Sequence, residues 1–147
     1  MNIRTLLTRT NALPRRTMAD TRKNVLVAGM GHFVSADWEQ QGKNGQQNTN
    51  RQTVVDEMER AKAEGYDCSL VDVNPEDPED TLRRIKEVLQ ERHCDIFMIG
   101  FAVRGNPKFT SMFEQLVNTS VEVSPKTKFG FFPKPDEVYS TLVRISS

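Results

Sequence analysis

Short apolar runs alternate with amphipathic segments along the chain from Asn24 onward, and no other feature of the sequence restricts the fold as strongly. The longest of these runs, residues 95–103, is almost wholly apolar. Continuous hydrophobicity over this length predicts a strand that is covered on both faces, as in a parallel sheet. Residues 24–29, 68–73 and 128–132 are shorter apolar or β-branched runs, and we predict the other three strands there.

Four amphipathic segments lie between and after these strands, and each has the marks of a helix. Residues 53–64 repeat apolar side chains at helical spacing and stop at Gly65. The second segment opens with Asp77 and Pro78, an N-cap residue followed by a proline in the first helical position. The last two segments are predicted to begin at Asn106-Pro107 and at Pro135.

The resulting order is βαβαβαβα, and crossovers of this length make the strands parallel, with helices on both faces of the sheet. We therefore predict an α/β fold of the flavodoxin-like or Rossmann-like kind. It would be a three-layer, doubly wound parallel sheet of four strands in the order 2-1-3-4. A chain of 147 residues has the length of one domain, which we place at residues 23–147.

The zero net charge of the chain hides a basic N-terminal segment. Residues 1–24 contain six basic side chains and only Asp20 as an acid, a net charge of +5, so the rest of the chain carries −5. Residues 1–22 are predicted to be either a disordered basic extension or a mitochondrial transit peptide. Met18 would serve as an alternative start of translation. The compartment is accordingly predicted to be the cytoplasm, or the mitochondrial matrix if the segment is a transit peptide.

Charge and composition exclude several classes of partner and protein. An acidic body without clustered Lys and Arg argues against binding to nucleic acid. No run approaches the roughly 18 apolar residues of a transmembrane helix, so we expect no membrane partner. Two cysteines do not make a disulfide scaffold, which favours a reducing compartment and buried, unpaired thiols.

A long polar loop, predicted at residues 30–52, follows the first strand, where doubly wound folds bind ligands. It begins with Gly29-Met30-Gly31, which starts like a dinucleotide-binding fingerprint, but Val34 stands where the third glycine is required. The same glycines equally fit a tight turn at the end of a strand. The lysine of a nucleotide-triphosphate loop and the acids of a phospho-acceptor site are also missing.

In the predicted strand order, the switch point lies between strands one and three, and a ligand would bind outside the carboxyl ends of these strands. Arg104 and Asn106 follow strand three, and Gly29 and Gly31 follow strand one. Arg104 is our first candidate for binding a carboxylate or phosphate through paired hydrogen bonds. It equally fits a salt bridge to a neighbouring acid or a cap on the ends of strands. Asp72, at the end of strand two, is predicted either to bind a ribose hydroxyl or to cap the following turn.

His32 and Asp37 are the candidate catalytic residues. The imidazole of His32 titrates near neutral pH and suits proton transfer, and Asp37 would orient it or act as a base. A packing histidine and a solvated loop acid are the alternatives for these residues. His32, Asp37 and Glu39 do not form a metal signature, so no metal site is predicted, and the cofactor stays unknown.

Three segments resemble small single-domain α/β proteins of unassigned activity, over about residues 95–145. The segments are residues 99–104, 112–118 and 125–128. The resemblance implies the α/β fold and favours Arg104 and Asn118 as site residues, and it implies no reaction. The chain departs from the pattern at residues 131–135, where those proteins have a polar turn that resembles Asn-Thr-Ser-Pro.

Two functions fit these features. The first is binding of a small anionic molecule at the switch point, with or without acid–base catalysis by His32. The second is a non-catalytic module that regulates or assembles with a partner through its helical faces. The convergence of a histidine and an arginine favours the first, and the absence of a complete catalytic motif favours the second. Whether the chain is an enzyme, and whether it forms a homo-oligomer, stays undecided by the sequence.

Overall fold

The fold is known from a computed structural model, which describes residues 22–31 and 44–146. The predicted N-terminal extension, residues 1–22, thus lies outside the described residues except for Arg22. The described elements, in chain order, are β1 (Lys23–Gly29), α4 (Asn44–Ala63), β2 (Tyr66–Asp72), α5 (Pro78–Glu91), β3 (Ile96–Gly100), α6 (Phe101–Arg104), the 3-10 turn η1 (Pro107–Phe109), α7 (Thr110–Val123), β4 (Lys128–Phe132), the 3-10 turn η2 (Pro135–Glu137) and α8 (Val138–Ser146).

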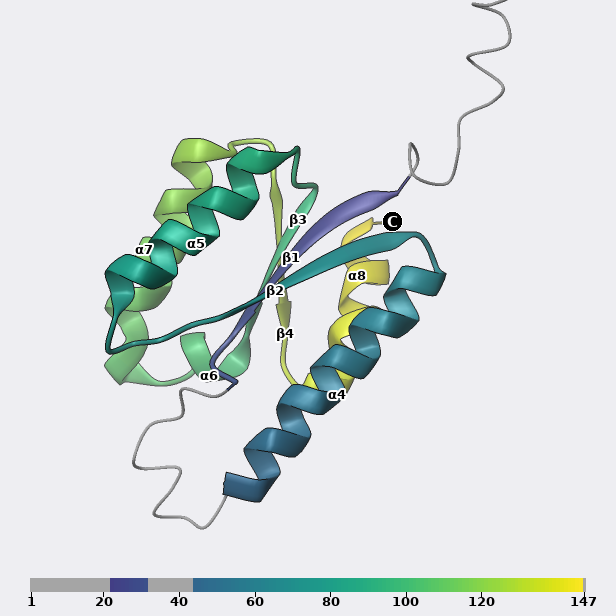
Figure 1. The fold of residues 1–147 in the computed structure, drawn as a ribbon, viewed down its shortest axis with the longest axis horizontal. Helices are drawn as coiled ribbons and strands as arrows, with labels where there is room; N and C mark the ends of the chain where they lie inside the picture. The colour runs from purple at the N-terminus through teal and green to yellow at the C-terminus, as the bar shows by residue number, and fades with distance from the viewer. Residues whose placement is uncertain (1–21, 32–43, 147) are drawn as a thin grey trace, which may run out of the picture.

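The four strands form one parallel sheet in the order β2-β1-β3-β4, which confirms the predicted topology. Figure 1 shows α5 and α7 on one side of this sheet and α4 and α8 on the other. The fold is therefore a three-layer α/β structure of the flavodoxin-like or Rossmann-like kind. Because β1 and β3 are neighbours whose crossovers leave in opposite directions, the switch point lies between their carboxyl ends.

Side chains alternate along each strand and build a separate core on each face of the sheet. Leu26, Phe97 and Ile99 point toward α5 and α7, where they pack with residues such as Ile85 and Leu116. The core on the other face is smaller and lies beneath α4 and α8. Its buried members are Val25, Val27, Ala61, Ile96, Met98, Phe132, Val138 and Leu142.

Two helix starts follow from the sequence signals. The carboxylate of Asp77 accepts a hydrogen bond from the Asp80 amide at 3.2 Å and caps α5, and Pro78 occupies the first turn as predicted. The last helix also begins where expected, because Pro135 opens η2, which runs into α8.

The predicted end of the third strand is wrong. β3 ends at Gly100, and the next four residues form the short helix α6, in which the Gly105 amide donates to the Phe101 carbonyl at 2.7 Å. Gly100 pairs with Phe132, the last residue of β4. Since β4 ends there, the backbone beyond Gly100 finds no further partner on that side and satisfies its polar groups in a helical turn.

The predicted loop at residues 30–52 is also wrong at its C-terminal end, because α4 begins at Asn44 rather than near Thr53. Residues 46–64 contain neither proline nor glycine, and glutamine, which occurs there repeatedly, has good helix propensity. The polar composition that indicated a loop is instead that of the first turns of a long helix.

Candidate functional site

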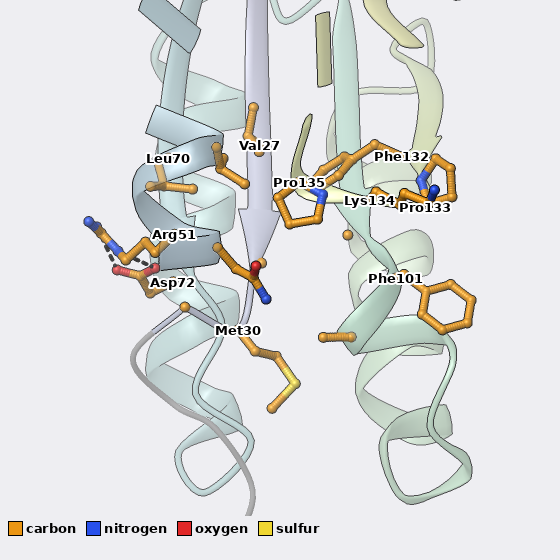
Figure 2. A pocket seen from close by; sticks show the side chains of 16 residues that line it. Val27, Met30, Arg51, Leu70, Asp72, Phe101, Phe132, Pro133, Lys134 and Pro135 are labelled. Atoms are coloured by element: carbon orange, nitrogen blue, oxygen red, sulfur yellow. Dashed lines mark hydrogen bonds and ion pairs between the residues drawn. The ribbon is translucent and has the colours of Figure 1, made fainter. Parts of the chain in front are cut away.

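A pocket of about 250 Å³ lies at the carboxyl ends of β1 and β3, beneath α4 (Figure 2). One wall comes from β1 and β2, and the opposite wall comes from the start of α6 and the turn after β4. The lining residues are Val27, Gly29, Met30, Gly31, Asn50, Arg51, Val54, Leu70, Asp72, Gly100, Phe101, Ala102, Phe132, Pro133, Lys134 and Pro135. The pocket therefore lies at the switch point, where open α/β sheets bind ligands.

Gly29, the last residue of β1, and Gly31, two residues later, have different roles. Gly31 has φ +40°, and a Cβ atom there would lie 2.3 Å from Asp72 Oδ1. No other residue type fits this position without displacing the carboxylate. A Cβ atom on Gly29 would meet no atom within 4 Å, so the space above Gly29 is part of the pocket itself. Gly29 therefore leaves the pocket deep, and Gly31 lets the chain pass beside Asp72.

Asp72 is bound on both carboxylate oxygens by Arg51 of α4. The Nε atom of Arg51 donates to Oδ1 at 3.1 Å, and Nη2 donates to Oδ2 at 3.0 Å. The two side chains are 32% and 16% exposed, respectively, which makes this a half-buried, bidentate pair. The charge of Asp72 is thus matched within the pocket wall, and the pair closes one side of the pocket, as Figure 2 shows.

Lys134 stands across the pocket from this pair (Figure 2). It is exposed, and within the described residues its ammonium group has no hydrogen bond or ion pair. Because Arg51 and Asp72 neutralise each other, Lys134 leaves the lining of the pocket with one uncompensated positive charge.

Apolar groups form most of the remaining wall. Val27 and Phe132 are buried in the core beneath α4, and Val54 and Leu70 pack against the same core. Phe132 also lies against Gly100, where a Cβ atom would come within 3.0 Å of its ring. A pocket with these walls favours a ligand with an apolar body and few polar groups.

Arg104, the first candidate from the sequence, is not among the lining residues. Its guanidinium carbon lies 5.2 Å from the Phe101 ring centre and 5.3 Å from that of Phe131. Its Nη2 atom is 3.5 Å from the Phe132 carbonyl oxygen, and its buried Nε has no partner. Burial lowers the pKa of Arg104. Within the described residues no acid pairs with it, so the predicted salt bridge is not found.

The other sequence candidates have four different outcomes. Gly29, Gly31 and Asp72 are brought together in the pocket. Asn106 instead accepts a hydrogen bond from the Lys108 amide at 3.0 Å and caps η1. His32 and Asp37 lie outside the described residues. Asn118, favoured by the resemblance, is exposed on α7.

Arg51 and Lys134 were not found by sequence reasoning. Arg51 fell in the segment predicted as a loop, and its partner Asp72 is distant in sequence, so no local motif links them. Lys134 stands between two prolines in the turn after the last strand, at a carboxyl end of the sheet. A parallel sheet brings the turns after its strands together at one edge. The position of Lys134 in such a turn was therefore a signal for its place near the pocket.

The two thiols lie apart from each other. Both are free, and burial raises the pKa of Cys68 to about 12 and raises that of Cys94 as well. Among residues 22–31 and 44–146, no three His, Cys, Asp or Glu side chains gather as metal ligands would. Of the helices described, none combines the length and apolar character needed to cross a membrane.

Comparisons with protein-family models, with curated proteins and with solved structures find no match to the chain. The function is therefore inferred from the pocket itself.

Proposed function

We propose that the pocket at the switch point binds a small organic molecule that carries a carboxylate or phosphate group. The observation that supports this function is the charge of the pocket wall. Arg51 and Asp72 match each other, and Lys134 adds a positive charge beside otherwise apolar walls. An anion gains a charge-assisted contact there, whereas a cation meets an unpaired ammonium group.

The size and walls of the pocket narrow the class of ligand. Its volume of about 250 Å³ lies below the roughly 300–1,000 Å³ of pockets that hold drug-sized molecules. Val27, Leu70 and Phe132 would contact an apolar body, while the exposed backbone at Gly29 allows close approach of the ligand. A small carboxylic acid or phosphate ester with a compact apolar part fits this description.

Acid–base catalysis is a second element of the proposal. His32 follows Gly31, a lining residue, directly in the sequence, and Asp37 lies five residues further on. If the bound molecule is a substrate, replacing His32 with Ala should abolish turnover and leave ligand affinity unchanged. Turnover that survives His32→Ala would remove this residue from the mechanism.

The binding proposal is tested with small carboxylic acids, each paired with its neutral amide. Ligand-observed NMR on the full chain measures which member of a pair binds. We expect acids to bind in preference to amides. We expect Lys134→Gln to weaken acid binding by about 1 kcal/mol, the upper range for an exposed ion pair.

The matched control is Lys128→Gln, because Lys128 is also exposed but stands at the opposite end of β4. Its replacement should leave binding unchanged. Equal binding of acids and amides, or equal effects of the two lysine substitutions, would contradict the proposal.

A further inference from the structure

β4 is an edge strand of the described sheet, and an aromatic surface lies on its outer side. Phe101 is 53% exposed and Phe131 is 37% exposed, and both rings lie close to the Arg104 guanidinium. Figure 2 shows the Phe101 ring turned away from the pocket. Phe113 of α7 packs on Phe131 at 6.0 Å between ring centres and extends this surface over the edge. We call Phe101, Arg104, Phe113 and Phe131 the edge cluster.

The segment that carries Phe131 is basic in sequence, although Lys128 stands at the opposite end of β4 and Lys134 lines the pocket. Residues 123–135 contain three lysines and no acid, although the chain beyond residue 24 carries a net charge of −5. The Nη2 atom of Arg144 adds a further cation, 3.4 Å from the Phe131 carbonyl oxygen. On the opposite edge of the sheet the charges are matched, because Asp67 of β2 pairs with Arg92 and Asp72 pairs with Arg51. An acidic partner would therefore favour the β4 edge.

The guanidinium of Arg104 has aromatic contacts but no acid partner among the described residues. Its carbon lies 5.2 and 5.3 Å from the centres of two rings, and its one hydrogen-bond contact, from Nη2, is long at 3.5 Å. Arg60 shows the contrasting arrangement within the same molecule. Its guanidinium lies 4.4 Å from the Tyr139 ring centre and also has an acid partner, Glu57, at 3.6 Å. Within residues 22–31 and 44–146, Arg104 has the aromatic contacts without the acid.

We propose that the edge cluster docks an acidic segment of a partner protein. A carboxylate of the segment binds Arg104, and a large apolar side chain next to it packs on the exposed rings of Phe101 and Phe131. The aromatic rings hold the arginine rigid, so little side-chain entropy is lost when the carboxylate binds. This surface shares Phe101 with the pocket lining, but the other members of the edge cluster do not line the pocket, and the inference does not rest on the proposed ligand.

The two other kinds of occupant fit less well. Single-stranded nucleic acid needs a positively charged groove along its backbone, and the chain beyond residue 24 carries a net charge of −5. A second copy of the chain would bring two Arg104 side chains to the same interface, and like charges at an interface oppose association.

Selection of random short peptides on the full-length chain tests the proposal. We expect the recovered peptides to place Asp or Glu beside Phe, Trp or Leu. Fluorescence anisotropy then gives the Kd of a recovered peptide for each variant. Arg104→Gln should raise the Kd by about tenfold or more, the usual worth of a charge-assisted hydrogen bond. Arg60→Gln is the matched control and should leave the Kd unchanged, and thermal unfolding checks that both variants are folded.

Five results would overturn the proposal. The first four are recovery of no peptides, recovery without enrichment of acids, binding that Arg104→Gln does not weaken, and equal binding of oligothymidylate that the same variant abolishes. The fourth would assign the surface to single-stranded nucleic acid. A dimer in sedimentation velocity that Phe131→Asp dissociates would assign it to a second copy and would also overturn the proposal.

Discussion

The pocket and the edge cluster lie on the two sides of one short segment, the end of β4, yet they are opposite in character. The pocket is concave and mostly apolar, and its arginine, Arg51, is bound by Asp72 through two hydrogen bonds. The edge cluster is exposed and aromatic, and no acid of the described residues pairs with Arg104. Arg51 is therefore part of the pocket wall, whereas no acid of the described residues neutralises the charge of Arg104.

Strand geometry produces this contrast. Successive side chains of β4 point to opposite faces of the sheet. Phe132 therefore enters the core beneath α4, where it lines the pocket and is 5% exposed, while Phe131 faces the edge cluster. One residue of offset separates a side chain that holds the pocket together from one that is displayed on the surface.

The largest difference in stability is expected between alanine substitutions of these two neighbours, Phe132 and Phe131. Phe132→Ala should lower the free energy of unfolding by about 3–5 kcal/mol, because it leaves a cavity in the core. Phe131→Ala should cost roughly 1–2 kcal/mol, since it removes only a half-exposed ring and its aromatic contacts. Urea unfolding measures both values. Similar losses in the two variants would mean that the edge cluster is part of the core rather than a surface.

The next largest effect should distinguish the two glycines of the pocket. Gly31→Ala should cost about 2–3 kcal/mol, because its backbone φ is positive and the new Cβ would collide with Asp72. Gly29→Ala should be neutral or should stabilise by up to about 1 kcal/mol, since its Cβ would enter empty space and the unfolded chain would lose entropy. Unfolding of both variants in urea checks this order, and a reversed order would show that Gly29 is the residue under constraint.

A smaller difference in stability is expected between substitutions of the two arginines, Arg51 and Arg104. A double-mutant cycle with Arg51→Gln and Asp72→Asn should give a coupling energy of about 1 kcal/mol for the half-buried pair. Arg104→Gln should change the unfolding free energy by less than about 0.5 kcal/mol, as is usual for a substitution that breaks no specific pair. A loss of several kcal/mol on Arg104→Gln would instead place Arg104 in the framework of the fold.

The last of these predictions concerns the thiol of Cys68, which packs against the core beneath α4. Burial raises the pKa of Cys68 to about 12 in the folded chain, from about 9.0 in the unfolded chain. Its contribution to stability is therefore complete below pH 9 and is lost as the pH rises toward 12, because only the unfolded state deprotonates easily. The alkaline loss of stability should be smaller in Cys68→Ala. Alkylation at pH 8 should be at least about tenfold slower in the folded than in the unfolded chain. Equal alkylation rates would mean that the layer under α4 opens readily.

The strand order was predictable because each strand is a compact apolar run and each crossover is long enough to carry a helix. Local signals also gave the start of α5, where Asp77 and Pro78 mark the first turn. The end of β3 was not predictable from its own residues. Phe101, Ala102 and Val103 are as apolar as the strand before them, and only the end of β4 at Phe132 decides that pairing stops at Gly100.

The candidate site was predictable in position but only partly in residues. Topology placed it at the ends of β1 and β3, and with it Gly29, Gly31 and Asp72. The positive charge of the site was predicted to come from Arg104 instead of Lys134. The side-chain direction of Arg104 depends on α6, which the sequence did not reveal. Lys134 is brought to the pocket by the turn between Pro133 and Pro135, and such a long-range placement has no local sequence signature.

The most direct measurement of ligand binding is a titration of the isotope-labelled chain with the tightest-binding carboxylate, followed by amide chemical shifts. In the native protein we expect the largest shifts at Gly29, Gly31 and Gly100, which line the pocket. In Gly29→Leu, whose Cβ would meet no atom within 4 Å and whose longer side chain should fill the pocket, these shifts should vanish while the spectrum stays that of a folded protein. Shifts that persist in Gly29→Leu, or that centre on Phe113 and Phe131, would contradict binding in the pocket.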